Sequence, residues 1–202
     1  MKRRIMLAFV PLVLAGCGYN QIQQKDETAA QAKQQISVQL QRRADLVPNL
    51  VNTVKGYAQH EEAVFVQVAQ ARGALTGAIQ GGDPTQMAAA NAQLTGALGR
   101  LIAVAEAYPQ LKADQTFLRL QDELAGTENR IATSRQDYNQ AVADYNAYIR
   151  QFPQRITATV TGAKPRTYYE AAPGSETAPT VDFGTRPPPS GGATTPAAPK
   201  TP

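Results

Sequence analysis

The amino-acid sequence predicts an all-α protein: an elongated antiparallel bundle of about four long helices, followed by an extended C-terminal arm and a disordered, proline-rich tail. Apolar residues recur at the three- and four-residue spacing of helices from about residue 20 to residue 152. No alternating pattern typical of strands competes before residue 154, and glycine or proline marks the ends of the periodic stretches. These observations predict four parts: a signal peptide at 1–16, the bundle at 17–153, the arm at 154–183 and the tail at 184–202.

The first sixteen residues have the pattern of a bacterial lipoprotein signal peptide. Three basic residues precede the apolar stretch Ile5 to Leu14, which is shorter than the roughly 20 residues that a membrane-spanning helix needs. The motif Leu14-Ala15-Gly16-Cys17 resembles a lipobox. Cleavage of the chain before its cysteine would leave an acylated Cys17 as the first mature residue. Cys17 is the only cysteine and directly follows the apolar stretch, which favours lipidation over a buried free thiol.

Two or three acyl chains hold a protein stably on a bilayer, whereas one chain does not. The sequence therefore predicts a membrane partner reached through a lipid anchor at Cys17. Gly18 follows the cysteine, where an Asp would be the inner-membrane retention signal of enteric bacteria. We therefore expect the protein in the bacterial cell envelope, on the periplasmic face of the outer membrane.

The charge balance argues against nucleic acid as a partner. The formal net charge is +4, but three of the 20 basic residues lie in the signal segment, which leaves 17 basic against 16 acidic residues. A nearly neutral chain lacks the cationic excess that drives phosphate binding. One cysteine and one histidine also exclude a Cys/His zinc site within one chain, and an internal disulfide.

The first two helices are predicted on either side of a proline. Residues 20–44 are polar with a narrow apolar stripe, and Pro48 predicts a kink or break at residues 45–47. A stronger apolar stripe runs from Leu50 to Ile79, and Gly81-Gly82 ends that helix.

The remaining helices have clear start signals. Asp83 is expected to cap a third helix with Pro84 in its first turn, and that helix ends before Pro109. Asp114 is expected to cap a last helix that reaches Phe152. Residues 156–160 alternate and predict a short extended segment against the bundle, to which residues 168–169 and 181–183 add apolar contacts. From residue 184 the composition is too poor in apolar residues to fold.

A short internal repeat stands out in the last helix. Asp137-Tyr138-Asn139 recurs one heptad later as Asp144-Tyr145-Asn146, so both tyrosines lie on one helix face. Their rings either pack in the core with the hydroxyl groups at its edge, or form an exposed aromatic platform for a ligand or glycan.

Several blocks of the chain, within about residues 19–183, resemble the LemA family. The blocks are Arg42 to Val51, Val54 to Ala58, His60-Glu61, Glu106 to Ala113, Phe117 to Gln121, Thr127 to Ala132 with Arg135, and Asp137 to Pro153. The resemblance implies an elongated antiparallel helical bundle outside the cytoplasm, with no established enzymatic activity or cofactor. Members usually carry an N-terminal transmembrane helix, and here a lipobox stands in its place. Magnetosome-membrane relatives suggest a membrane-organising role.

The sequence offers little for catalysis. His60-Glu61-Glu62 has Val64 where a zinc protease helix needs its second histidine. Glu106, Glu123 and Glu128 lack the histidines of a di-iron bundle. We therefore predict that the protein is not an enzyme and has no catalytic residue, metal or cofactor. Catalysis would require that those glutamates lie beside His60 in a solvent-filled cleft.

The predicted function is that of a non-catalytic envelope lipoprotein, an interaction or membrane-organising scaffold whose partners are envelope proteins. The candidate partner surface comprises Arg42, Arg43, Asp45, Asn49, Lys55 and Tyr57, although helix ending and capping also explain the first three. The alternative is a binding module for peptidoglycan or lipid, which requires Tyr138, Tyr145 and Tyr148 to be exposed.

Overall fold

The computed structural model describes residues 2–170 of the 202-residue chain, and their side chains from residue 18 onward. Every regular element in this part is a helix, which confirms the predicted all-α class. The predictions for residues 181–183 and for the tail at 184–202 lie outside the described residues. The helices are α1 (Lys2–Lys55), α2 (Glu62–Gly81), α3 (Pro84–Glu106), α4 (Pro109–Lys112), α5 (Gln115–Tyr148) and α6 (Gln154–Thr161).

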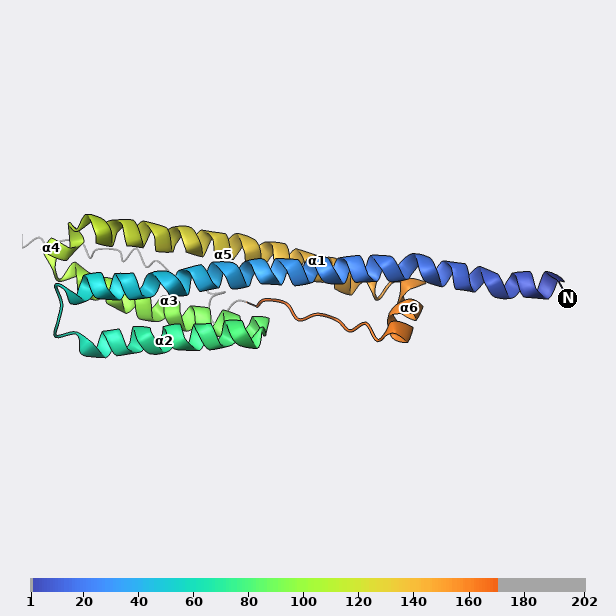
Figure 1. Ribbon diagram of the computed structural model, residues 1–202, viewed down its shortest axis with the longest axis horizontal. Coiled ribbons are helices and arrows are strands. Elements are labelled where there is room, and N and C mark those ends of the chain that lie inside the picture. The colour runs from blue at the N-terminus through green and yellow to red at the C-terminus, as the bar shows by residue number, and fades with distance from the viewer. Residues whose placement is uncertain (1, 171–202) are drawn as a thin grey trace, which may run out of the picture. The chain divides into compact units, whose positions relative to one another are not determined.

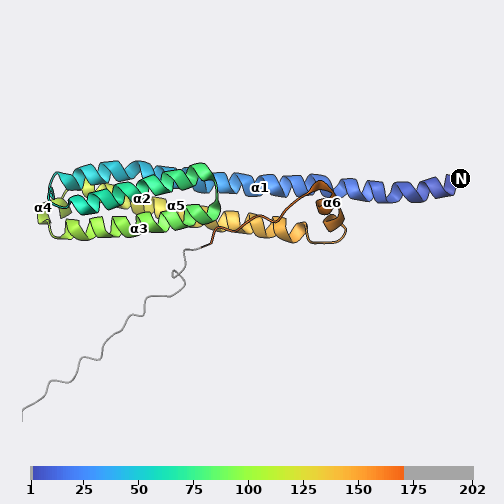
Figure 2. The ribbon, with the colours of Figure 1, turned by 90° about the horizontal axis from the view of Figure 1, so that it is seen from below.

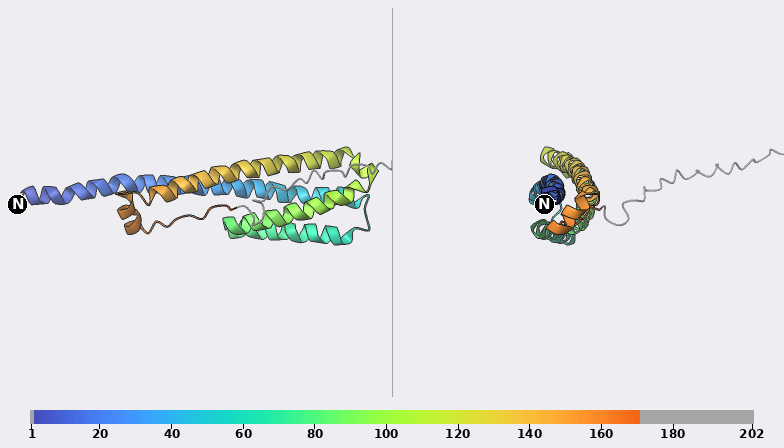
Figure 3. Two further views of the ribbon diagram at one scale, coloured as in Figure 1. Left: turned by 180° about the vertical axis from the view of Figure 1, so that it is seen from behind. Right: turned by 90° about the vertical axis from the view of Figure 1, so that its right-hand side faces the viewer.

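The helices pack as two antiparallel pairs. The long helices α1 and α5 run side by side in opposite directions, and α2 and α3 form the second pair (Figures 1 and 2). α2 lies mainly against the C-terminal part of α1, whereas α6 lies against α1 beyond the end of α5 (Figure 3). The predicted apolar stripes contain all of the largest fully buried side chains except Val47 and Leu111. These side chains are Ile22, Ile36, Leu40, Val47, Leu50, Val54, Leu75, Met87, Leu94, Leu101, Leu111 and Tyr138.

Local signals set most helix ends where they were predicted. Asp83 accepts a hydrogen bond from the Thr85 backbone N–H at 2.8 Å, and Pro84 occupies the first turn of α3. Asp114 accepts from the Phe117 N–H at 2.9 Å and caps α5. Gly82 ends α2 at φ +69°, a left-handed conformation that costs glycine little.

Of the predicted kink or break before Pro48, the break does not occur, because α1 continues through this residue to Lys55. A proline within a helix has no N–H to donate to the carbonyl four residues earlier, which here belongs to the buried Ala44. Arg72 of α2 donates its Nε–H to that carbonyl at 2.8 Å. A side chain from the neighbouring helix thus replaces the missing backbone bond, and α2 begins only at Glu62.

The predicted extended segment at residues 156–160 was also wrong, since these residues belong to α6. Threonines alternate with the apolar residues here, and this alternation suggested a strand. Ile156 and Val160 also have the four-residue spacing of a helix, which is the structure they adopt. Ala158 is buried against α1, whereas Ile156 and Val160 are exposed. α5 ends at Tyr148, four residues before the predicted Phe152, and the chain turns there into α6.

Candidate functional site

A buried cation lies where three helices meet. Arg43 of α1 is 5% exposed and donates from Nη1 to Asn91 Oδ1 of α3 at 2.8 Å and to Glu128 Oε2 of α5. Burial lowers the pKa of Arg43, and the carboxylate of Glu128 opposes that change. The arrangement joins α1, α3 and α5 through one guanidinium, so Arg43 is excluded from the predicted partner surface.

The tyrosines of the heptad repeat belong to the core. Tyr138 and Tyr145 are 2% and 3% exposed, and Tyr148 is half-buried with Lys25 Nζ 5.6 Å from its ring centre. The Tyr138 hydroxyl donates to the Thr167 carbonyl at 2.7 Å. Burial of the Tyr138 and Tyr145 rings removes the exposed aromatic platform that the alternative function, a binding module for peptidoglycan or lipid, required.

The asparagines of the same repeat hold the segment that follows α6. Asn139 accepts from the Tyr169 N–H at 2.8 Å and donates to the Tyr169 carbonyl at 3.0 Å. Asn146 makes the same two bonds to the backbone of Arg166, at 2.8 and 2.9 Å. Each amide therefore pairs with the extended backbone as a neighbouring strand would. The repeat was visible in the sequence, but its role in docking residues 163–170 was not predicted.

An ion pair fixes the same segment to α1. Arg166 donates from Nε and Nη2 to the two carboxylate oxygens of Asp26, at 2.7 and 2.9 Å. The guanidinium holds the pKa of Asp26 below its ordinary value, and Asp26 raises the pKa of Arg166. Such two-point pairs fix orientation as well as position.

Replacing both Asn139 and Asn146 with Ala is expected to detach residues 163–170 from α5. Each change removes two hydrogen bonds to the backbone, which we expect to cost about 1–2 kcal/mol of local stability. Hydrogen exchange at the amides of Arg166 and Tyr169 measures the effect directly. Asn129→Ala on the exposed face of α5 is the control, and unchanged protection in the double variant would contradict the assignment.

The attachment of this segment is expected to weaken in acid. Because the pKa of Asp26 is lower in the folded chain, the pair contributes stability that is fully present above about pH 4 and is lost as the pH falls through the folded value. The protection factor of the Arg166 amide should therefore decline at low pH. In Asp26→Asn it should be low at every pH, and an unaltered pH profile in that variant would rule the pair out as the cause.

The other residues of the predicted surface lie along the C-terminal part of α1 and just after it. Arg42 is exposed and 3.6 Å from Glu123 of α5, a surface pair of the kind that contributes little to stability. Asp45 is exposed and accepts from Gln41 at 2.8 Å, and Asn49 is also exposed. Lys55 Nζ lies 5.3 Å from the centre of the Phe65 ring.

Tyr57 connects the loop after α1 to the start of α5. Its hydroxyl donates to Asp114 Oδ2 at 3.0 Å, while the other carboxylate oxygen caps α5. These bonds lower the pKa of Asp114, and the contact with Asp114 raises the pKa of Tyr57. Tyr57 is 41% exposed, so part of its ring remains available.

Two of the three glutamates weighed for catalysis pair with arginines. His60 is exposed in the loop before α2, whereas Glu123 and Glu128 face Arg42 and Arg43. Among the residues whose side chains are described, no three His, Cys, Asp or Glu side chains form a group that could hold a metal ion.

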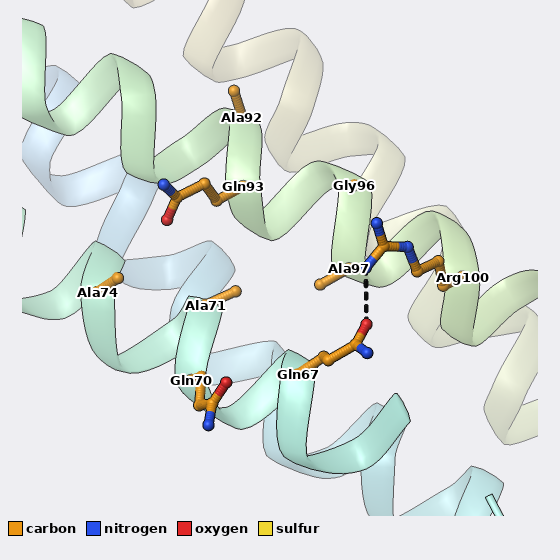
Figure 4. A pocket seen from close by; sticks show the side chains of 9 residues that line it. All are labelled: Gln67, Gln70, Ala71, Ala74, Ala92, Gln93, Gly96, Ala97 and Arg100. Carbon is orange, nitrogen blue, oxygen red and sulfur yellow. Dashed lines mark hydrogen bonds between the residues drawn. The ribbon is translucent and has the colours of Figure 1, made fainter. Parts of the chain in front are cut away.

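A groove of about 480 Å³ lies between α2 and α3 (Figure 4). Its lining is alanine, glycine and glutamine, with Arg100 as the one charged side chain. Arg100 donates from Nη1 to Gln67 Oε1 at 2.7 Å across the groove (Figure 4). Small side chains bring the two helices close, and no acid–base pair lines this groove.

Comparison with known proteins identifies the family. The family model for LemA matches residues 32–183. The magnetosome proteins MamQ 2 and MamQ 1 of Paramagnetospirillum magneticum are each 29% identical to this chain over 197 residues, covering 85% of this chain and 71% of the relative. Magnetosome protein MamQ of Magnetospirillum gryphiswaldense is 28% identical over 195 residues with the same coverage.

Within the described part, no helix is long and apolar enough to cross a bilayer. Because the family match extends over more than half of the chain, this protein belongs to the LemA family.

Proposed function

We propose that this LemA-family member is a non-catalytic lipoprotein of the cell envelope, held by acyl chains on Cys17. The observation that carries the proposal is the lipobox Leu14-Ala15-Gly16-Cys17, which closes the apolar stretch that begins at Ile5. Two or three buried acyl chains suffice for stable anchoring. Gly18 in place of Asp supports the periplasmic face of the outer membrane.

In this proposal the bundle acts as an interaction or membrane-organising scaffold. Four buried or half-buried charged residues support a structural role, because they form ion pairs that hold the fold together. Arg43 pairs with Glu128 between helices, and Arg166 of the segment at 163–170 pairs with Asp26. The names of the relatives, magnetosome proteins, agree with a membrane-associated role. Envelope proteins are the proposed partners, and the exposed residues Arg42, Asp45, Asn49, Lys55 and Tyr57 are the proposed contact surface.

Replacing Cys17 with Ser tests the anchor. The variant is expected to remain an uncleaved precursor that incorporates no labelled palmitate and shows no shift on globomycin treatment, because the thiol that receives the lipid is gone. Asn20→Ser, just beyond the lipobox, should be processed normally. Palmitate labelling that persists in Cys17→Ser would contradict the proposal.

Photo-crosslinking in cells tests the scaffold role. A crosslinking residue at Arg42 or Asn49 should capture a specific envelope protein, identified by mass spectrometry. The same residue at Ala92, exposed on α3, is the matched control. Equal capture from all positions, or capture only of peptidoglycan fragments, would contradict a protein partner on this surface.

A further inference from the structure

The outer face of α6 is apolar and exposed. Ile156 and Val160 are 57% and 83% exposed and lie about one turn of α6 apart, and Phe152, in the turn just before α6, is 83% exposed. The opposite face packs on α1 through Ala158, which is 5% exposed. Among the exposed large apolar side chains of the described part, these three lie closest together in the sequence, on α6 and in the turn before it. Grouped apolar residues on a rigid element mark an interaction surface.

This face lies beside the proposed lipid anchor. α6 contacts α1 near its residue Gly18, where a Cβ atom would lie 3.6 Å from both the Gln154 and Thr157 side chains. Gly18 is the residue that directly follows Cys17, and Tyr19, the next residue, is 45% exposed. Tyrosine is enriched at the level of lipid headgroups. An anchor at Cys17 would therefore bring α6 to the bilayer surface.

The charges around α6 complement an anionic surface. Residues 145–169 contain no Asp or Glu but four basic residues, and residues 1–25 contain no acidic residue either. Arg166 is paired with Asp26, which leaves Arg150, Arg155 and Lys164 exposed. Arg150 and Arg155 line a concavity of about 430 Å³ between the end of α5 and α6. Its arginine lining suits a headgroup phosphate.

We propose that α6 is a second membrane contact, which inserts Ile156 and Val160, together with Phe152 of the preceding turn, among the headgroups of an anionic phospholipid bilayer. Its three exposed cations bind lipid phosphates at the rim of the apolar face. The inference rests on the proposed anchor at Cys17, because the anchor keeps this short helix at the surface, where a weak contact becomes effective. The contact fixes how the bundle is oriented on the membrane.

A fluorescent label at residue 160 tests the insertion. Val160→Cys is purified from membranes, labelled with the environment-sensitive dye NBD, and reconstituted in vesicles of phosphatidylglycerol and phosphatidylcholine that carry nitroxide lipids. We expect emission at shorter wavelength and quenching by the nitroxide. The matched control is Val66→Cys on α2, also an exposed valine, whose label should remain in water.

The number of labels per chain distinguishes a failure of the Cys17 anchor from a failure of the α6 contact. An acylated Cys17 cannot react, so Val160→Cys takes one label per chain if the anchor exists. Two labels per chain would contradict the anchor, and α6 would then be tested in the Cys17→Ser background. One label per chain with unquenched emission at residue 160 would overturn the α6 contact while leaving the anchor intact.

The charge requirement is tested in the same labelled protein. Each replacement of Arg150, Arg155 or Lys164 with Gln should reduce the ratio of inserted to free α6 by about fivefold, the equivalent of about 1 kcal/mol per cation at an anionic surface. Arg130→Gln, exposed on α5, should have no effect. Insertion should also weaken at high salt. Equal quenching in pure phosphatidylcholine vesicles would overturn the electrostatic part of the proposal.

Discussion

Replacement of Glu128 with Leu is expected to lower the free energy of unfolding by about 2–4 kcal/mol, because it leaves the Arg43 guanidinium buried without its counter-charge. The expected loss lies below that for a fully buried pair, since 47% of the Glu128 side chain is exposed and water already reaches it. Asn91 still accepts one bond from Arg43 but cannot offset the charge.

The reverse replacement is expected to cost much less. Arg43→Met removes the buried charge and keeps most of the side-chain volume, and Glu128 can then be hydrated, so a loss of about 1 kcal/mol or less is expected. The double variant should resemble Arg43→Met alone. Urea unfolding followed by circular dichroism measures all three variants. Equal losses in the two single variants would refute the burial argument.

Arg72→Ala is expected to destabilise the protein by about 1–3 kcal/mol, because the buried Ala44 carbonyl loses its donor. Its Nε–H reaches this carbonyl at 2.8 Å where Pro48 has no N–H to offer. Arg100→Ala is the matched control on α3, since its guanidinium bonds only to the exposed Gln67 side chain among the described residues. That change should stay within about 0.5 kcal/mol.

A double-mutant cycle identifies the cause. In Pro48→Ala the backbone N–H of residue 48 can donate to the Ala44 carbonyl, so Arg72→Ala should then cost less than about 1 kcal/mol. The same urea unfolding measures the coupling between the two positions. An unchanged cost of Arg72→Ala in the Pro48→Ala background would mean that Arg72 stabilises α1 in some other way.

Local patterns predicted the elements that depend on local interactions. The caps at Asp83 and Asp114 and the termination at Gly82 involve atoms within four residues, so residue type and spacing were sufficient. The misread α6 shows the limit of this reasoning. Its eight residues fit both the two-residue period of a strand and the four-residue spacing of a helix.

The burial of Arg43 could not be predicted from the sequence for a different reason. Arg43 follows Arg42 directly and has the same charge, yet one side chain is buried and the other exposed. A step of one residue rotates a helix by about 100°, which follows from its 3.6 residues per turn. Burial is therefore decided by which helix packs on which face.

The all-α class, most helix ends, the family and the motif on which the lipid anchor is proposed could all be inferred from the chain, because each depends on neighbouring residues or on a continuous pattern. Three features emerge only from the packing of the helices: α1 passes through Pro48, Arg43 is a core residue, and the repeated asparagines hold residues 163–170. The bonds responsible join residues 20 to 85 positions apart. Such partners become neighbours only when the helices pack, so no local pattern specifies them.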